Sequence, residues 1–220
     1  MEFYDRKAEI EILQQNEKKA ERNAVFTVLM GRRRVGKTSL VIKALEGKPF
    51  AYLFVSKDSE AMLCRKFQQT LEEQLGLQVY GQLTRFRDVF EVIMKESPQR
   101  HFTVVIDEFQ NLCKVNPAIF SEIQDLWDRY HRDSHLNLIT MGSIRSLMKR
   151  IFEDKNEPLY GRPTSKFTLL PFSVKDDKVI NFLFHNENWK LKVEKCVNDC
   201  VVIQFSSGRC RQDTAQVRRG

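Results

Sequence analysis

The clearest chemical pattern in the chain lies between Gly31 and Thr38, which read Gly-Arg-Arg-Arg-Val-Gly-Lys-Thr. The two glycines let the backbone curl, so that successive N–H groups can face a single anionic centre. Lys37 can then reach the β- and γ-phosphates of a nucleotide, and the Thr38 hydroxyl can ligate Mg²⁺. The pattern predicts a phosphate-binding loop, with a chance glycine-rich turn as the alternative. The predicted nucleotide-binding residues are Gly31, Arg32, Arg33, Arg34, Val35, Gly36, Lys37, Thr38 and Ser39.

The second chemical feature is a pair of acids, Asp107 and Glu108, directly after the β-forming run 103–106. A buried strand that ends this way brings both carboxylates to the edge of a parallel sheet where ligands bind. There Asp107 would hold Mg²⁺ through water, and Glu108 would polarise the water that attacks the γ-phosphate. The alternative is that the acids only cap the start of a helix. This alternative is less favoured here, because the acid pair and the phosphate-binding loop together complete one site.

Two further polar residues have two readings each. Ser143 ends another apolar run, 136–142, where it can contact the γ-phosphate or the attacking water, or cap the helix that follows. Arg162, in the segment Leu-Tyr-Gly-Arg-Pro, can offset charge in a phosphoryl-transfer transition state. From the sequence alone, an ordinary surface arginine is the better account of Arg162.

The basic net charge is concentrated in two short segments. The chain has 36 Lys and Arg against 29 Asp and Glu, a formal net charge of +7. Three of these charges are Arg32, Arg33 and Arg34, and residues 204–220 hold a net three more, which leaves the body nearly neutral. We therefore do not interpret the charge as a nucleic-acid footprint. The three arginines can touch a partner, a neighbouring subunit or nucleic acid, but raising the local ATP concentration is the plainer account.

Several classes of protein are excluded or disfavoured. No apolar run approaches the ~18 residues that a membrane-spanning helix needs, and the acidic start MEFYDRKAEIE is no secretory signal, so we expect a cytoplasmic protein without membrane contact. The odd number of cysteines indicates reduced thiols, and the spacing of Cys196, Cys200, Cys210 and His185 does not match structural zinc sites. There is no Asn-Lys-x-Asp run for guanine, and 220 residues are too few for a two-lobed helicase.

The elements that must position these residues alternate between strands and helices. Near-continuous apolar runs predict strands at 25–30, 50–55, 102–106, 136–141 and 167–170. Apolar residues at steps of three and four predict helices over 5–20, 37–46, 61–75, 86–94, 119–130 and 144–151. Strands separated by helices imply an α/β fold with a doubly wound, mostly parallel five-stranded sheet and helices on both faces. One strand runs directly into the phosphate-binding loop and one helix leaves it, as the motif requires.

Four segments together resemble a known family. GRRRVGKTSL, VVIDEFQNL, LITMGSIRSLM and EPLYGRPTSKFTLLPFS, in this order, resemble the archaeal-type ATPases of the STAND and AAA-like branch of P-loop NTPases. The opening FYDRKAEIEIL resembles that family's N-terminal box, a helix near the adenine. The resemblance covers about residues 1–180 and implies a sheet in which the Ser143 strand lies between the loop strand and the Asp107 strand. It also implies roles for Glu108 as catalytic base, Ser143 as sensor, Arg162 as γ-phosphate-sensing arginine, and Phe3 and Arg6 as neighbours of the nucleotide.

The last part of the chain departs from the family pattern. Members usually continue into a helical lid and a winged helix, whereas here residues 189–197 suggest one more element and the residues from Ser206 onward are polar and basic. We expect a P-loop ATPase domain over 1–185, then a remnant of the lid and a disordered basic tail over 186–220. A C-terminal truncation or frameshift, or a short variant that works with a partner chain, would explain this ending.

The sequence thus predicts Mg²⁺-dependent ATP binding and slow hydrolysis, acting as a conformational switch or motor domain. One alternative is a nucleotide-binding remnant or partner-binding module without turnover. Another is a DNA-associated ATPase that uses Arg32, Arg33, Arg34 and the basic tail, although the charge distribution gives it little support. The expected partners are ATP and either a partner protein or a second copy of the chain.

Overall fold

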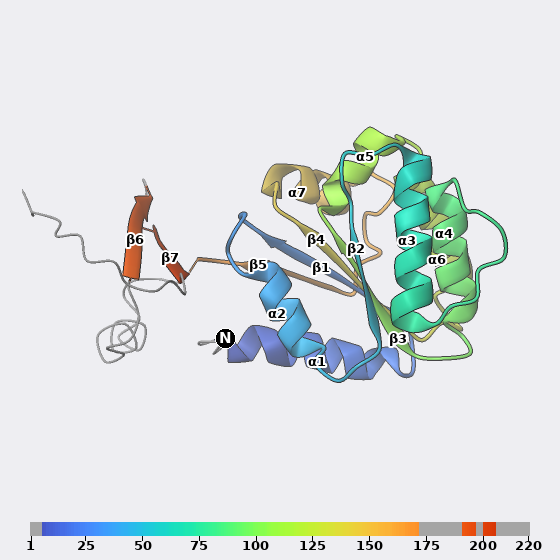
Figure 1. The fold of residues 1–220 in the computed structure, drawn as a ribbon, viewed down its shortest axis with the longest axis horizontal. Helices are drawn as coiled ribbons and strands as arrows, with labels where there is room; N and C mark the ends of the chain where they lie inside the picture. Colours follow the sequence, from blue (N-terminus) through green and yellow to red (C-terminus); the bar gives the residue numbers. More distant parts are fainter. Residues whose placement is uncertain (1–5, 172–190, 197–199, 206–220) are drawn as a thin grey trace, which may run out of the picture. The chain divides into compact units, whose positions relative to one another are not determined.

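The computed structural model describes residues 6–171, 191–196 and 200–205 (Figure 1). The chain divides into two compact units, residues 1–170 and residues 171–220. Phe3, His185, Cys210 and the predicted tail from Ser206 lie outside the described residues. Within the described part, no helix has the length and apolar character needed to cross a membrane.

The first unit is built on a five-stranded sheet in the order β2-β3-β4-β1-β5, in which each pair of neighbours is parallel. The fold class predicted from the sequence is therefore confirmed. β4 lies between β1 and β3, as the family resemblance implied. The strands are β1 (Val25–Gly31), β2 (Phe50–Phe54), β3 (Phe102–Asp107), β4 (Leu136–Gly142) and β5 (Ser165–Leu169).

Helices cover both faces of this sheet (Figure 1). α1 and α2 lie on one face, while α3, α4 and α6 lie on the other. A 3₁₀ turn, η1, and the short α5 follow β3 and were not anticipated. The helical elements of this unit are α1 (Lys7–Ala20), α2 (Lys37–Ala44), α3 (Glu60–Leu75), α4 (Phe86–Glu96), η1 (Phe109–Asn111), α5 (Leu112–Val115), α6 (Ile119–Tyr130) and α7 (Arg145–Glu153).

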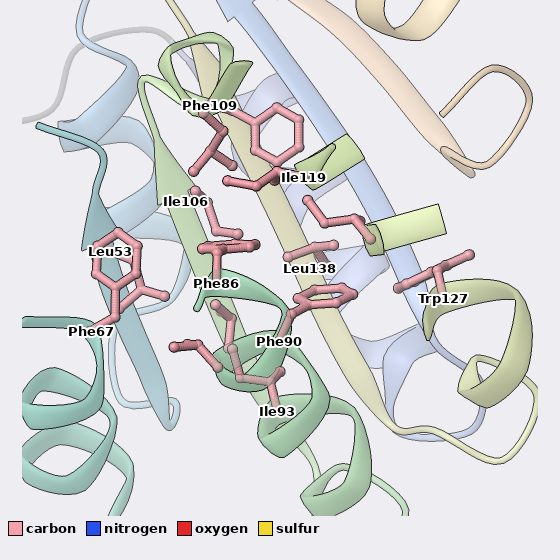
Figure 2. Packing of buried hydrophobic residues seen from close by; sticks show 14 of the residues in the cluster. Leu53, Phe67, Phe86, Phe90, Ile93, Ile106, Phe109, Ile119, Trp127 and Leu138 are labelled. Atoms are coloured by element: carbon pink, nitrogen blue, oxygen red, sulfur yellow. The ribbon is translucent and has the colours of Figure 1, made fainter. Parts of the chain in front are cut away.

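The two-sided burial explains why the central strands are apolar at most positions. Successive side chains of a strand point to opposite faces, so neighbouring residues enter different cores. In β3, Val104 and Ile106 join the cluster under α3, α4 and α6, whereas Val105 joins the cluster under α1 and α2. Figure 2 shows aromatic residues of the helices, among them Phe86, Phe90 and Trp127, packed against the apolar side chains of the sheet.

The second unit contains an antiparallel hairpin of β6 (Leu191–Cys196) and β7 (Cys200–Phe205), in which Cys196 lies opposite Cys200 in the strand register. The single element expected near 189–197 thus corresponds to β6, and the sequence analysis missed its partner strand. An alternating run such as Leu-Lys-Val-Glu-Lys-Cys fits a strand with two different faces.

Candidate functional site

The predicted phosphate-binding loop connects the end of β1 with the start of α2. Two of its residues have a left-handed backbone, Arg34 with φ 62° and Gly36 with φ 93°, and these turn the chain back toward the helix. Gly31 is required for a different reason: a Cβ atom there would lie 2.9 Å from the carbonyl oxygen of Leu169 in β5. The first N–H groups of a helix have no partner within it, so the start of α2 presents donors and a positive dipole end to an anion.

Lys37 folds back over the loop. Its ammonium donates to the carbonyl oxygens of Gly31 at 2.9 Å and Arg32 at 3.1 Å. Burial lowers the pKa of Lys37, while the negative charges of Asp107 and Glu108 act in the opposite direction. The ammonium is therefore a partly desolvated cation between the loop and the acid pair, a place where a phosphate would be a favourable partner.

The remaining loop residues lie at the surface or anchor the loop. The side chains of Arg32, Arg33 and Arg34 are exposed, as is Ser39 in the first turn of α2. Val35 is half-buried and packs against the cluster under α1 and α2. The positive charge of Arg33 also contributes to the lowered pKa of Lys37, so this arginine adds to the positive potential around the loop.

Asp107 and Thr38, the two predicted metal ligands, lie together. The Thr38 hydroxyl is 3.5 Å from the Asp107 carboxylate oxygen Oδ2. Asp107 is the last residue of β3 and faces α2, because Val105, two residues before it, is buried under the same helix. The Thr38 hydroxyl and the Asp107 carboxylate both offer hard oxygen atoms, the ligand type that Mg²⁺ prefers.

Tyr52 is a third member of this group, which the sequence analysis did not single out. It lies on β2, next to β3, and its hydroxyl donates a short hydrogen bond to Oδ2 of Asp107 and lies 3.5 Å from Thr38 Oγ1. Burial, together with the hydrogen bond to Asp107, raises the pKa of Tyr52 well above its usual value. The phenol therefore stays protonated and acts as the donor to the carboxylate.

Glu108 points to a different set of partners from its neighbour Asp107. Its backbone is left-handed, with φ 53°, which ends the strand and redirects the side chain. Its Oε2 atom accepts a hydrogen bond from Ser143 Oγ at 2.9 Å and another from the Gln110 side-chain amide. The structure thus brings Glu108 and Ser143 together and adds Gln110, which the sequence analysis missed.

Gly142 makes room for Gln110. A Cβ atom on Gly142 would overlap Met148 Sδ and come within 2.5 Å of Gln110 Oε1. Both side chains are fully buried, and Gln110 Oε1 has no hydrogen-bond partner in the described part of the chain. The orientation of the amide that holds Glu108 therefore depends on a glycine at the end of β4.

We predict that Gly142→Ala destabilises the protein by about 1–3 kcal/mol, the range typical of overpacking a close-packed core. The added methyl group must displace Met148 or Gln110, and both are enclosed. Urea unfolding of the variant and of Ser146→Ala, an exposed position on α7, measures the difference. Equal midpoints for Gly142→Ala and the wild type would mean that the two side chains relax without cost.

Arg6 lies at the same edge of the sheet as the loop. Its guanidinium pairs with Glu9 at 3.0 Å and donates to the Leu170 carbonyl at 2.6 Å. The neighbouring residue Leu169 is paired with Gly31, the first residue of the loop. Arg6 therefore lies close to the loop, and its place beside a bound nucleotide stays a prediction.

Arg162 is not brought to the loop. It forms a two-pronged ion pair with Asp128 at 2.9 and 3.3 Å and shares a surface pocket with Ala24, which precedes β1. The backbone N–H of Thr164 donates to the carbonyl oxygen of Phe26 at 2.8 Å, which fixes this segment beside the beginning of β1. The loop, in contrast, follows the end of β1. At the usual rise per residue, the seven residues of β1 separate the two places by roughly 20 Å. The structure therefore does not bring Arg162 to the loop of its own chain.

The residues fit a magnesium nucleotide. Lys37 and the start of α2 match phosphate oxygens, and Thr38 with Asp107 supplies two oxygen ligands for Mg²⁺. The described residues hold no group of three or more His, Cys, Asp and Glu side chains that could bind a metal by themselves. A metal at this site would thus share its coordination with the phosphates.

The parallel sheet, the loop and the acid pair define a P-loop NTPase. Within that class, a family described as the ATPase domain predominantly from Archaea matches residues 3–197, and the chain belongs to this family. Membership supports nucleotide binding and ATPase activity in general.

Individual relatives extend beyond this chain. An uncharacterized protein of Methanocaldococcus jannaschii, MJECL04, is 30% identical over 173 residues, which is 79% of this chain and 37% of that protein. The Walker-type ATPase PABY2304 of Pyrococcus abyssi has a TM-score of 0.60 at 22% identity, over 83% of this chain and 57% of that one. Cdc6p of Pyrobaculum aerophilum has a TM-score of 0.55 at 15% identity, over 83% and 49%. The two structures show the same fold, and this chain spans about a third to just over half of these relatives.

Proposed function

We propose that this domain binds ATP together with Mg²⁺ and hydrolyses it slowly, as a conformational switch. The single observation that carries the proposal is the convergence of Lys37, Thr38, Asp107, Glu108 and Ser143 at one edge of the sheet. Family membership supports the nucleotide and the general activity. The metal, the slow rate and the switch are our inferences from the residues.

Each residue has a distinct role in this proposal. Lys37 and the N–H groups at the start of α2 would hold the phosphates, and Thr38 and Asp107 would hold the metal. Bound Mg²⁺ would supply charge neutralisation at the phosphate oxygens. Glu108 would accept the proton of the attacking water, because its Oε1 atom is not the one to which Ser143 and Gln110 donate.

The expected rate is low for the isolated chain. An arginine that stabilises the transferring phosphoryl group raises turnover strongly in related chemistry. Arg162 lies at the opposite edge of the sheet, bound to Asp128, so any such assistance from it would act on the nucleotide of a neighbouring copy. A reaction that needs an arginine from a second chain would suit a switch that responds to assembly.

Two other functions are weaker. If the protein is a partner-binding module without turnover, Lys37 and Thr38 still bind the nucleotide, but Glu108 has no catalytic role. A DNA-associated ATPase draws on Arg32, Arg33 and Arg34 and on a structural neighbour, the ORC1 protein of Aeropyrum pernix in complex with DNA. The three arginines border the phosphate-binding loop, where the charge of ATP already accounts for them.

Equilibrium ATP binding and phosphate release, measured on the same preparation with Mg²⁺ and with EDTA, test the proposal. We expect saturable binding and slow, Mg²⁺-dependent release of phosphate, with GTP a poor competitor. Binding without any release would favour the module without turnover. If DNA accelerates release and loses this effect steeply with salt, the DNA-associated function is correct instead.

A further inference from the structure

We propose that the Tyr52 hydroxyl competes with Mg²⁺ for Asp107 and so sets the metal concentration at which this site is loaded. The inference rests on the proposed function, since it concerns the metal that would accompany ATP. It assigns Tyr52 as a positioning residue, acting through Asp107.

The first observation is that three oxygen atoms share one small space. Thr38 Oγ1 lies 3.5 Å from Asp107 Oδ2 and 3.5 Å from the Tyr52 hydroxyl, which is itself hydrogen-bonded to Oδ2. A metal bound by Thr38, or a water on that metal, reaches Asp107 through the gap between these atoms. The Tyr52 hydroxyl projects into the same gap.

The second observation is that Asp107 has little other capacity. Its Oδ1 atom accepts the backbone N–H of Glu108 at 2.7 Å, a bond that belongs to the turn ending β3. Asp107 as a whole is 7% exposed, so little of it faces water. Oδ2, which lies near Thr38 Oγ1 and is bonded to Tyr52, is therefore the oxygen that a metal held by Thr38 would share with Tyr52.

The third observation is that Tyr52 is held in place from its backbone outward. β2 pairs with β3 so that Tyr52 is opposite Val105. The N–H of Tyr52, on the outer edge of β2, donates to Gln74 Oε1 at 3.0 Å. Its ring packs against the cluster under α1 and α2. The backbone pairing and the packing of the ring thus fix the position of the hydroxyl beside Asp107.

These contacts predict that removing the hydroxyl lowers the stability of the metal-free protein but strengthens its binding of Mg²⁺. Without metal, Tyr52→Phe leaves a buried carboxylate with one strong donor fewer, so the protein should melt at a lower temperature than the wild type. With ATP present, the metal no longer displaces a charge-assisted hydrogen bond, so it should bind more tightly. A packing role alone would lower stability without tightening metal binding.

The test is a Mg²⁺ titration of thermal stability at fixed ATP, for the wild type and Tyr52→Phe. We expect the half-saturating Mg²⁺ concentration to fall by about fivefold or more in the variant, given the strength of hydrogen bonds to charged groups. ATP binding in EDTA should be the same in both proteins, because the phosphate contacts of Lys37 do not involve Tyr52. The metal-free melting temperature should fall only in Tyr52→Phe.

Tyr130→Phe is the matched control, a half-buried tyrosine at the end of α6 that packs against the other core cluster. It should leave the half-saturating Mg²⁺ concentration unchanged. An unchanged or higher value in Tyr52→Phe overturns the inference, the higher value meaning that the hydroxyl supports the bound metal. A wild type that gains no stability from Mg-ATP contradicts the proposed function instead, and the metal-free melts then still decide whether Tyr52 supports Asp107.

Discussion

Replacing Lys37 by alanine is expected to abolish the stabilisation that Mg-ATP gives to the wild-type protein. At about 100 times its dissociation constant, a ligand that binds only the folded state stabilises it by about 2.7 kcal/mol. For a domain of this size, that gain raises the melting temperature by roughly 2–4 °C per kcal/mol. The wild type should therefore shift by several degrees and Lys37→Ala should not shift at all.

The physical reason lies in the position of the Lys37 ammonium. It is buried, bonds to two loop carbonyls, and is the cation that the structure places between the loop and the acid pair. An alanine removes the charge that would pair with the β- and γ-phosphates. It also removes the positive charge of Lys37 from beside Asp107 and Glu108, so less of their repulsion toward the phosphates is offset.

The matched control is Lys43→Ala, on the same helix. Lys43 is exposed and pairs with Glu46 at the surface, an interaction that contributes little to stability. This variant should keep the full shift with Mg-ATP. If Lys37→Ala also keeps it, the nucleotide does not use this loop, and the assignment of residues 31–39 is wrong.

The parts of the site that could be predicted are those encoded within one short segment. The loop between Gly31 and Thr38 could be predicted because its glycines are needed for the local backbone turn. The strands could be predicted because their side chains are apolar on both faces. The acid pair follows from its position at the end of such a strand. Gly76 illustrates the same locality, because the expected helix end is there, with the left-handed backbone of a C-cap.

The parts that could not be predicted depend on which strands become neighbours. Tyr52 meets Asp107 only because β2 pairs with β3, and its own segment, Phe-Ala-Tyr-Leu-Phe, carries no sign of chemistry. Gln110 meets Glu108 only because a short 3₁₀ turn follows β3 where the sequence suggested nothing regular. Arg162 reads as a candidate by its surroundings in the sequence, but its segment runs beside the wrong end of β1.

The adjacent acids show how one turn separates two tasks. Asp107 faces α2 because it continues the alternation of β3, and there it meets Thr38 and Tyr52. Glu108 leaves that alternation through its left-handed backbone and meets Ser143 on the next strand. One residue can therefore serve the metal and the next the water, although they are neighbours in the sequence. A substitution of Glu108 should then affect turnover and leave nucleotide binding intact.

Glu108→Gln is accordingly expected to lower the rate of phosphate release by about 10²-fold or more, the usual contribution of a positioned general base. The glutamine keeps the size of the side chain and can still accept the Ser143 hydrogen bond, but it cannot take a proton. The thermal shift with Mg-ATP should remain, because Lys37, Thr38 and Asp107 are unchanged. Single-turnover phosphate release, measured beside the melt, separates the two effects.

Glu153→Gln provides the comparison, since Glu153 is an exposed residue at the end of α7 whose nearest cation, Lys149, is 3.9 Å away. It should release phosphate as fast as the wild type. If Glu108→Gln does so too, the base is another group and Glu108 merely orders the end of β4 through Ser143. If Glu108→Gln loses the thermal shift as well, the two acids do not act separately, and the turn at Glu108 is needed to keep Asp107 in its place beside Thr38.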